Sequence, residues 1–343
     1  MDIRNRRAVR AAASEALAAN PGDPRMVVLI YVAITAVSSL LVSALVNVLA
    51  DRINETSGLA GMGARSILST IQTCLPIAQT VILWGVQLGY QKAAVHMARR
   101  QPALPRNLQE GFAYFGPLVR AMLLQGGIYL MMGFITIQVA YIIFMLMPFS
   151  AGFMELVLPL VSDPNAFYNA LYTDEALYSQ VAMSLLPMIP IWLALMCFTA
   201  APFFYSCRMV NYVILDRPGT GALMAMGESG RMMHGSRGAL FRVDLGYWWF
   251  HLAHFLLNSF LFGSMLLLLM GFSASVTETL IICGMMAVCL LVQGLLNFFF
   301  LNRVETTYAT AYDALRPRPQ ESQGGAVLGN IFDLARDYRE DEM

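Results

Sequence analysis

Charged side chains are scarce in this sequence. Aspartate, glutamate, lysine and arginine make up 13% of the 343 residues, whereas 57% are hydrophobic. A soluble domain carries roughly 25% charged residues, so this shortage excludes an ordinary soluble protein and indicates a chain that lies mostly in a membrane. The formal net charge is zero. The charge balance therefore gives no reason to expect nucleic acid as a partner.

Paired cysteines and catalytic motifs are also lacking. The five cysteines lie in or beside apolar segments, and none forms a C-x-x-C pair, which argues against a disulfide framework or a structural zinc site. The phosphate-binding, metalloprotease and serine-hydrolase motifs do not occur. No charged residue lies in the middle of an apolar segment, which disfavours a transport cycle driven by a carboxylate. We expect no catalytic residue, no metal and no cofactor.

Long apolar stretches dominate what remains. About 20 mostly apolar residues cross a bilayer as a helix, and six stretches qualify, so we predict an all-α fold, a polytopic transmembrane helical bundle. The predicted spans cover about residues 26–50, 67–90, 118–147, 181–207, 245–272 and 280–301. We divide the chain into an N-terminal helix at 1–25, a six-span membrane domain at 26–315, and a flexible tail with a short helix at 316–343.

Basic residues are divided very unequally between the two sides of these spans. Twenty of the 22 lie in the N-terminal segment, in the tail, or around the loops after the second and fourth spans; only Arg52 and Arg65 lie on the other side. Cytoplasmic loops retain positive charge, so this division predicts that both termini are cytoplasmic. The longest outer loop, residues 148–180, is acidic, and its role cannot be read from the sequence.

The cytoplasmic loop after the fourth span carries four arginines at or near the membrane surface: Arg208, Arg231, Arg237 and Arg242. Two interpretations are open. The arginines can pair with acidic neighbours and fix the loop, or they can contact lipid phosphate or a partner. An apolar stripe in the same loop predicts a short amphipathic helix whose apolar face holds Leu223, Met226, Gly230 and Met233.

Uncharged polar residues recur at helical spacing inside the predicted spans: Gln79, His251, His254, Asn258, Gln293 and Asn297. They are typical of hydrogen bonds that join neighbouring helices, and the nearby pair Gly85 and Gly89 fits close helix packing. Alternatively, they line a polar cavity that opens to the cytoplasm between the second, fifth and sixth spans. The sequence leaves both interpretations open.

Three segments on the cytoplasmic side carry a family resemblance. They are 205–216 (YSCRMVNYVILD), 229–249 with its paired Trp248 and Trp249, and Tyr308 with Tyr312. Together they resemble the uncharacterised bacterial membrane proteins of domain-of-unknown-function family 975. The resemblance covers about residues 8–315 and implies a multi-pass protein of the bacterial plasma membrane, without established catalytic residues. Gly246 departs from the serine expected there.

These patterns favour a non-catalytic membrane protein that acts in transport or as a scaffold through its cytoplasmic face. Its expected partners are the lipid bilayer and, through the cytoplasmic segments, another protein or a second copy of the chain. Two alternatives stay open. One is a small-solute permease with a polar cavity that faces the cytoplasm. The other is an intramembrane enzyme that uses His251 or His254 as a base.

Overall fold

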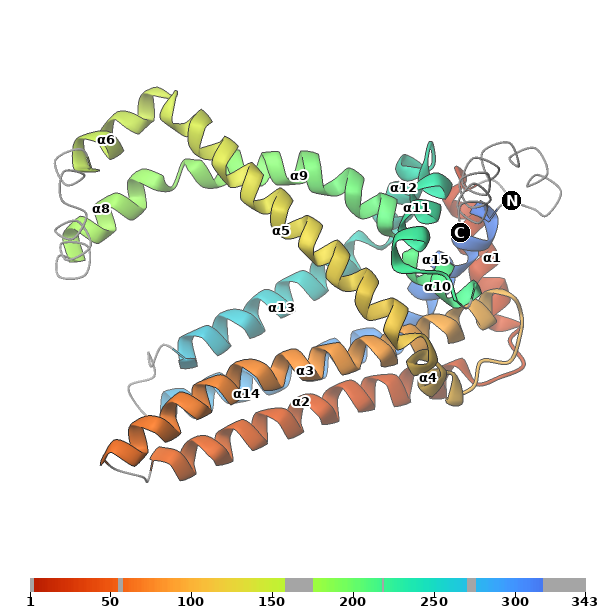
Figure 1. Ribbon diagram of the computed structural model, residues 1–343. Helices are drawn as coiled ribbons and strands as arrows, with labels where there is room; N and C mark the ends of the chain where they lie inside the picture. The colour runs from red at the N-terminus through yellow and green to blue at the C-terminus, as the bar shows by residue number, and fades with distance from the viewer. Residues whose placement is uncertain (1–2, 55–57, 158–174, 218, 270–275, 317–343) are drawn as a thin grey trace, which may run out of the picture. The chain divides into compact units, whose positions relative to one another are not determined.

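The described part of the computed structural model, residues 3–54, 58–157, 175–217, 219–269 and 276–316, is built from helices and contains no strand (Figure 1). The all-α class is therefore confirmed for these residues. The middle of the acidic outer loop and the predicted helix of the tail lie outside them.

Four helical stretches in the described residues are long and apolar enough to cross a membrane. They are Pro24–Val42, Arg106–Met145, Met188–Asp216 and Leu280–Leu315, and they coincide with the predicted first, third, fourth and sixth spans. Two further helices, α3 (Gly58–Ala98) and α13 (Trp248–Leu269), coincide with the predicted second and fifth spans.

The chain divides into two compact units, residues 120–208 and the remainder. The smaller unit holds most of α5 (Phe115–Met145), followed by η2 (Pro148–Ser150), α6 (Ala151–Val157), α8 (Glu175–Leu185) and α9 (Met188–Cys207). Tyr129 of α5 meets the ring of Phe203 of α9 edge-on, with 5.1 Å between ring centroids. The predicted fourth span is interrupted between α8 and α9 at Pro187, since proline supplies no backbone N–H for a continuous helix.

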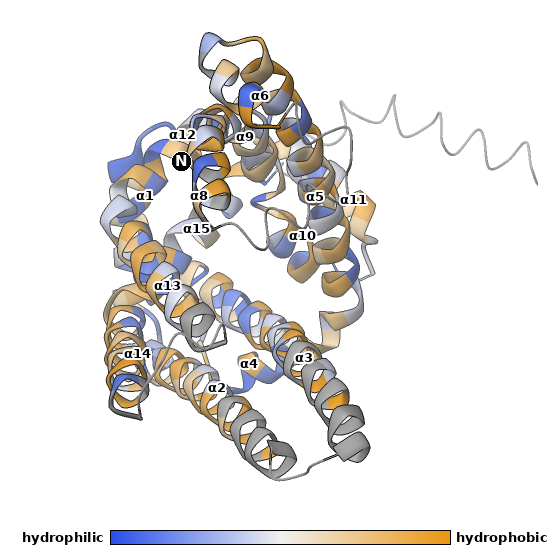
Figure 2. Cartoon of the chain, turned by 90° about the vertical axis from the view of Figure 1, so that its left-hand side faces the viewer, coloured by the Kyte–Doolittle hydropathy of each residue, from blue (hydrophilic) through white to orange (hydrophobic). Residues whose placement is uncertain are grey.

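The larger unit holds the other helices. They are α1 (Arg6–Ala18), α2 (Pro24–Asn54), α3, α4 (Arg106–Glu110), η1 (Gly111–Tyr114), α10 (Val210–Asp216), α11 (Ala222–Met233), α12 (Arg237–Asp244), η4 (Leu245–Tyr247), α13, α14 (Val276–Leu296), η5 (Asn297–Leu301) and α15 (Asn302–Leu315). Hydrophobic residues make up much of the long helices α2, α3, α13 and α14 (Figure 2). Leu41 of α2 and Val288 of α14, for example, are more than 60% exposed, as expected of side chains that face lipid.

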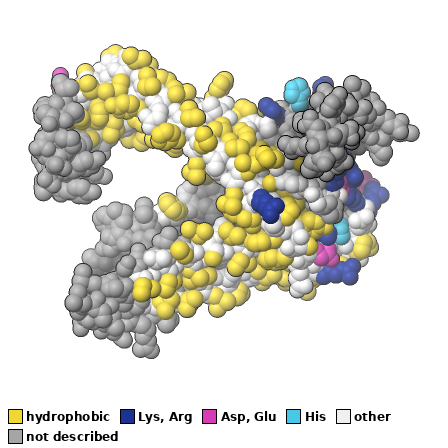
Figure 3. Space-filling view, in the orientation of Figure 1, with side chains coloured by type: hydrophobic (Ala, Val, Ile, Leu, Met, Phe, Trp, Pro, Cys, Tyr) yellow, Lys and Arg dark blue, Asp and Glu magenta, His cyan; other side chains and the backbone are white. Residues whose placement is uncertain are grey.

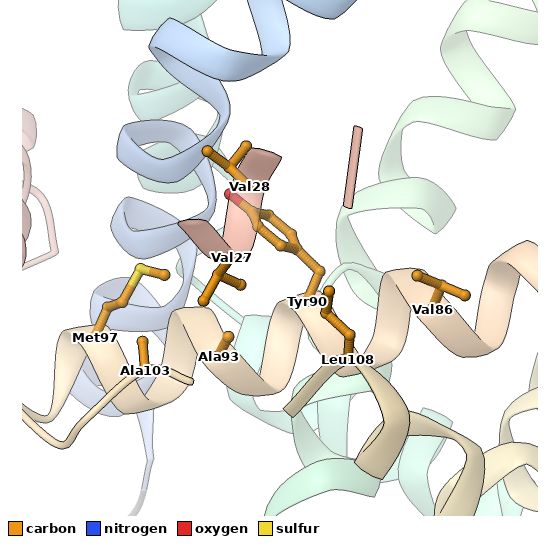
Figure 4. Close-up of a cluster of buried hydrophobic side chains, with 8 residues drawn as sticks. All are labelled: Val27, Val28, Val86, Tyr90, Ala93, Met97, Ala103 and Leu108. Atoms are coloured by element: carbon orange, nitrogen blue, oxygen red, sulfur yellow. The ribbon is translucent and has the colours of Figure 1, made fainter. Parts of the chain in front are cut away.

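Most buried side chains of the larger unit lie at one end, which we call the charged end: α1, α4, α10, α11, α12, α15 and the last turns of α3. Charged side chains gather over this end of the unit (Figure 3). An apolar cluster at this end joins α2, α3, α4 and the residues just before α4 (Figure 4). It is formed by Val27, Val28, Val86, Tyr90, Ala93, Met97, Ala103 and Leu108.

Glycines allow α3 to approach the following turn at backbone contact. A Cβ atom on Gly89 would overlap the main chain at Asn107 and Leu108, and one on Gly85 would lie 2.7 Å from the ring of Phe112. Gly111 of η1 in turn sits directly on the backbone of α3. The Gly85/Gly89 pair therefore packs α3 against α4 and η1.

The predicted amphipathic helix exists as α11, but its expected apolar face is wrong. The side chains buried on α11 are Ala225, Glu228, Ser229, Met232 and Met233, whereas Leu223 is 74% exposed. Two polar contacts explain the difference. The Ser229 hydroxyl accepts a hydrogen bond from the Met209 N–H at 3.2 Å, and Glu228 pairs with Arg217 at 2.7 Å. Burial of partnered polar groups thus sets the rotation of this helix.

Candidate functional site

A cavity of about 250 Å³ lies between α2 and α14 in the larger unit. Its lining is rich in hydroxyl and amide groups, and none of the described lining residues is charged. The lining residues are Tyr31, Val32, Thr35, Ala36, Ser39, Leu290, Gln293, Gly294 and Asn297. Such a surface can bind an uncharged polar group through several hydrogen bonds.

Gln79 of α3 reaches the edge of this cavity. Its side-chain amide donates to the hydroxyl of Ser39 at 3.1 Å and lies 3.3 Å from that of Ser38. Ser39 also lines the cavity. Gln79 therefore joins α3 to α2 and fixes the position of a cavity hydroxyl.

Gln293 connects the opposite wall to α13. Its amide nitrogen lies 3.3 Å from Nδ1 of His254 and donates to the Asn258 carbonyl oxygen at 3.2 Å. His254 and Asn258 therefore stand behind a lining residue and contribute no lining surface of their own. Five of the six predicted polar residues thus belong to one connected group, around a cavity between the first and sixth predicted spans.

The helix geometry changes at the cavity. Residues Asn297–Leu301 form a π-helical stretch, η5, between α14 and α15, and Asn297 lines the cavity. Single π-helical turns inside α-helices widen the backbone and are frequent at functional sites. No simple sequence signal, such as a proline, marks this stretch.

His251, the sixth predicted residue, takes part in a different chain of hydrogen bonds. Its Nε2 atom lies 3.1 Å from the hydroxyl of Tyr308, which donates to a carboxylate oxygen of Asp244. Tyr308 is only 2% exposed. This chain joins α13 to α12 and α15, so the two histidines point to different surroundings. An enzymatic role for either one stays a prediction.

An ion-pair network at the charged end joins three helices, and no sequence pattern indicates it. Arg99, which follows α3, pairs with Asp313 of α15 at 2.6 Å and with Asp216 of α10 at 3.1 Å. Hydrogen bonding to Asp313 is the main cause that raises the pKa of Arg99 above its usual value, which further stabilises a guanidinium that is charged at any physiological pH. Asp216 also accepts from the hydroxyl of Tyr312 and pairs with Arg316, both at 3.1 Å.

The four predicted loop arginines have separate environments. The guanidinium of Arg208 lies 5.2 Å from the ring centroid of Phe204 in the smaller unit. In the larger unit, Arg231 and Arg237 are exposed, while Arg242 donates to the Gly238 carbonyl oxygen at 3.3 Å. Of the acidic residues near them in sequence, Asp216 and Glu228 are paired with other arginines, and Asp244 accepts a hydrogen bond from Tyr308.

Potential metal ligands are scattered through the described residues. There, no three histidine, cysteine, aspartate or glutamate side chains come close enough together to hold a metal ion. The five cysteines are present as free thiols.

Comparison with known proteins identifies a family for this chain. No curated protein and no solved structure matches the chain. The family described as "Protein of unknown function (DUF975)" matches residues 1–319. This range includes the segments 205–216 and 229–249, together with Tyr308 and Tyr312, which suggested the resemblance. Because the match covers all but the last residues of the sequence, the chain belongs to the DUF975 family.

Proposed function

We propose that the chain crosses the plasma membrane of a bacterium six times, with both termini in the cytoplasm. The lopsided distribution of arginine supports this topology, as does the position of α3 and α13 at the predicted second and fifth spans. Packing of α1 against α15 adds support, because it brings the first and last described helices to the same end of the larger unit. The charged end is then the cytoplasmic end.

The function that this architecture supports best is a non-catalytic scaffold, whose cytoplasmic end presents a rigid surface to a partner protein. One observation carries the proposal: the charged end is assembled from well-separated stretches of chain into one interlocked body. Arg99, Asp216 and Asp313 join three of its helices. The charged end is needed neither to span the bilayer nor to cover the apolar helices. We therefore propose that it recognises a partner protein.

The outer face of α11 is the proposed contact. Leu223 and Met224 are 74% and 67% exposed on a helix whose other side is buried. Large apolar side chains that stand exposed together on a folded surface are typical of partner contacts. The proposed partner is therefore a protein with a complementary apolar pocket.

A photo-crosslinking amino acid at position 223 tests the scaffold function in intact cells. We expect the probe to give a crosslinked product of one defined mass. Introducing Met224→Asp into the same probe-carrying protein should abolish this product. The matched control carries the probe at position 130 of α5, because Leu130 is 77% exposed on an apolar helix. If position 223 yields no protein product, or only the products seen from position 130, the scaffold proposal is refuted.

The cavity between α2 and α14 supports a second candidate function, passage or binding of a small polar solute. The specific observation is its lining, in which hydroxyl and amide groups surround about 250 Å³ beside a π-helical stretch. A membrane helix exposes such groups to a cavity only when another polar group or water satisfies them. The uncharged lining favours an uncharged solute over an ion.

Thiol labelling in a cysteine-free background distinguishes a wet cavity from helix packing. Ala36 lines the cavity, whereas its neighbour Val37 is 53% exposed and does not line it. We expect Ala36→Cys to react with a charged, water-soluble thiol reagent added from the cytoplasmic side, and Val37→Cys to react at least about tenfold more slowly, because thiolate forms only where water reaches the sulfur. Equal rates, or no reaction at position 36, would contradict a solute cavity.

A further inference from the structure

Four arginines converge on a shallow concave surface at the charged end. The concavity measures about 460 Å³ and is lined by Arg4, Asn5, Arg6, Arg7 and Arg242. The first four residues belong to the start of α1 and the turn before it, whereas Arg242 belongs to α12. Among the described lining residues there is no acidic side chain. Two segments that lie more than 200 residues apart in the sequence thus create one strongly positive surface.

Folded contacts hold the two sides of this surface together. The guanidinium of Arg10, one turn along α1, lies 4.5 Å from the ring centroid of Tyr247 in η4, directly after α12. Val9 and Ala13 on the same helix are buried. The side chain of Asn5 is occupied as the N-cap of α1, since it accepts from the Ala8 N–H at 3.2 Å. Each guanidinium carries five N–H donors, so the arginines supply most of the hydrogen-bond donors on this surface.

Like charges repel, so an anion that contacts several of these guanidinium groups at once lowers their mutual repulsion. Arginine binds phosphate through two parallel N–H donors, and this planar geometry suits several arginines around one or two phosphate groups. A phosphate-bearing ligand is therefore the class that this surface fits.

Exposed aromatic residues place the same surface at the bilayer boundary. Arg242 is flanked by Phe241 and Leu245, which are 49% and 44% exposed, and Trp248 and Trp249 follow at 59% and 37%. Tryptophan side chains at the start of a membrane helix are typical of the level of the lipid headgroups. A ligand held by Arg242 would therefore lie at that level, where the phosphates of phospholipids are found.

We propose that Arg4, Arg6, Arg7 and Arg242 form a binding site for the phosphate-bearing headgroup of an anionic phospholipid. The site is independent of the scaffold function and of the cavity between α2 and α14. The acyl chains of the bound phospholipid would lie against the exposed apolar surface that starts at Leu245 and Trp248. Bound lipid would hold α1 against α12 and so brace the charged end on the membrane.

Lipid titration of the purified, detergent-solubilised protein tests this site. Thermal stability is measured while phosphatidylglycerol, phosphatidylcholine or water-soluble glycerol phosphate is added. We expect phosphatidylglycerol to raise the Tm, and Arg6→Gln/Arg242→Gln to weaken its apparent affinity at least about tenfold, because the variant loses charge-assisted hydrogen bonds to the phosphate. Arg25→Gln/Arg231→Gln is the matched control, because it removes the same charge from exposed arginines outside the concavity.

The outcomes separate the site from general attraction. An equal loss of affinity in the control variant would show that only the net charge of the protein matters. A rise in Tm with phosphatidylcholine as large as that with phosphatidylglycerol would show that the charge of the headgroup does not matter. Either result overturns the proposal. A response to glycerol phosphate as strong as that to phosphatidylglycerol would assign the site to a soluble phosphate and overturn the lipid. A second variant, Arg4→Gln/Arg7→Gln, must reproduce the loss while the Tm without lipid is kept.

Discussion

Replacing Gly111 with alanine is expected to destabilise the larger unit by about 3 kcal/mol or more, because overpacking against atoms that cannot move is costly. A Cβ atom at this position would lie 2.7 Å from Cα of Gly89 and closer still to other backbone atoms of α3. Backbone atoms of a helix cannot rotate away as a side chain can. The detergent-solubilised protein is heated to a series of temperatures, and size-exclusion chromatography measures the fraction that remains monodisperse. The temperature at which half of the protein is lost from the monodisperse peak is compared between variants.

Gly116→Ala is the matched control for this substitution. Gly116 lies five residues later, at the start of α5, and a Cβ atom added there would have no neighbouring atom within 4 Å. Alanine is the better helix former by about 1 kcal/mol, so the control should be neutral or slightly stabilising. Equal destabilisation by both variants would show that α3 and η1 do not meet at backbone contact.

Some features of the larger unit could be predicted because they depend on local chemistry alone. Hydropathy and length located the helices α2 and α14, and the spacing of Gly85 and Gly89 indicated close packing. Helical spacing predicts that His254 and Asn258 share one face, because residues four apart lie on the same side of a helix, and both side chains contact the amide of Gln293.

Other features depend on which helices are neighbours, and periodicity does not contain that information. Most side chains on all faces of these helices are apolar, so hydropathy cannot reveal that α2 rather than α3 forms the cavity wall opposite Gln293. For the same reason the face of α11 was predicted incorrectly: its rotation is set by Ser229 and Glu228, whose partners lie elsewhere in the chain. Arg99 was counted only as a positive charge on the cytoplasmic side, and its sequence neighbours give no hint of Asp216 or Asp313.

Replacing Arg99 with alanine should have the second large effect, a loss of about 2–3 kcal/mol of stability at the charged end. The side chain of Asp216 is only 8% exposed, and Arg99 supplies one of its two ion pairs. Asp313 loses its arginine as well. Removing one member of a partly buried network leaves carboxylates without compensation, which costs more than the pair itself contributes. Proteolysis of the charged end in intact membranes is a suitable measurement, because it reports local opening.

The adjacent arginine provides the control. Arg100 pairs with Glu15 at 2.6 Å, but the two side chains are 58% and 70% exposed, and exposed pairs contribute about 1 kcal/mol or less. Arg100→Ala should therefore leave the proteolysis rate nearly unchanged. A double-mutant cycle with Asp313→Ala isolates the Arg99–Asp313 interaction from the general loss of charge. If the two substitutions prove additive, or if Arg100→Ala opens the charged end as readily as Arg99→Ala, then the Arg99 network does not hold α3, α10 and α15 together. In that case contacts other than the Arg99 network would have to hold together the charged end, on which the proposed scaffold function depends.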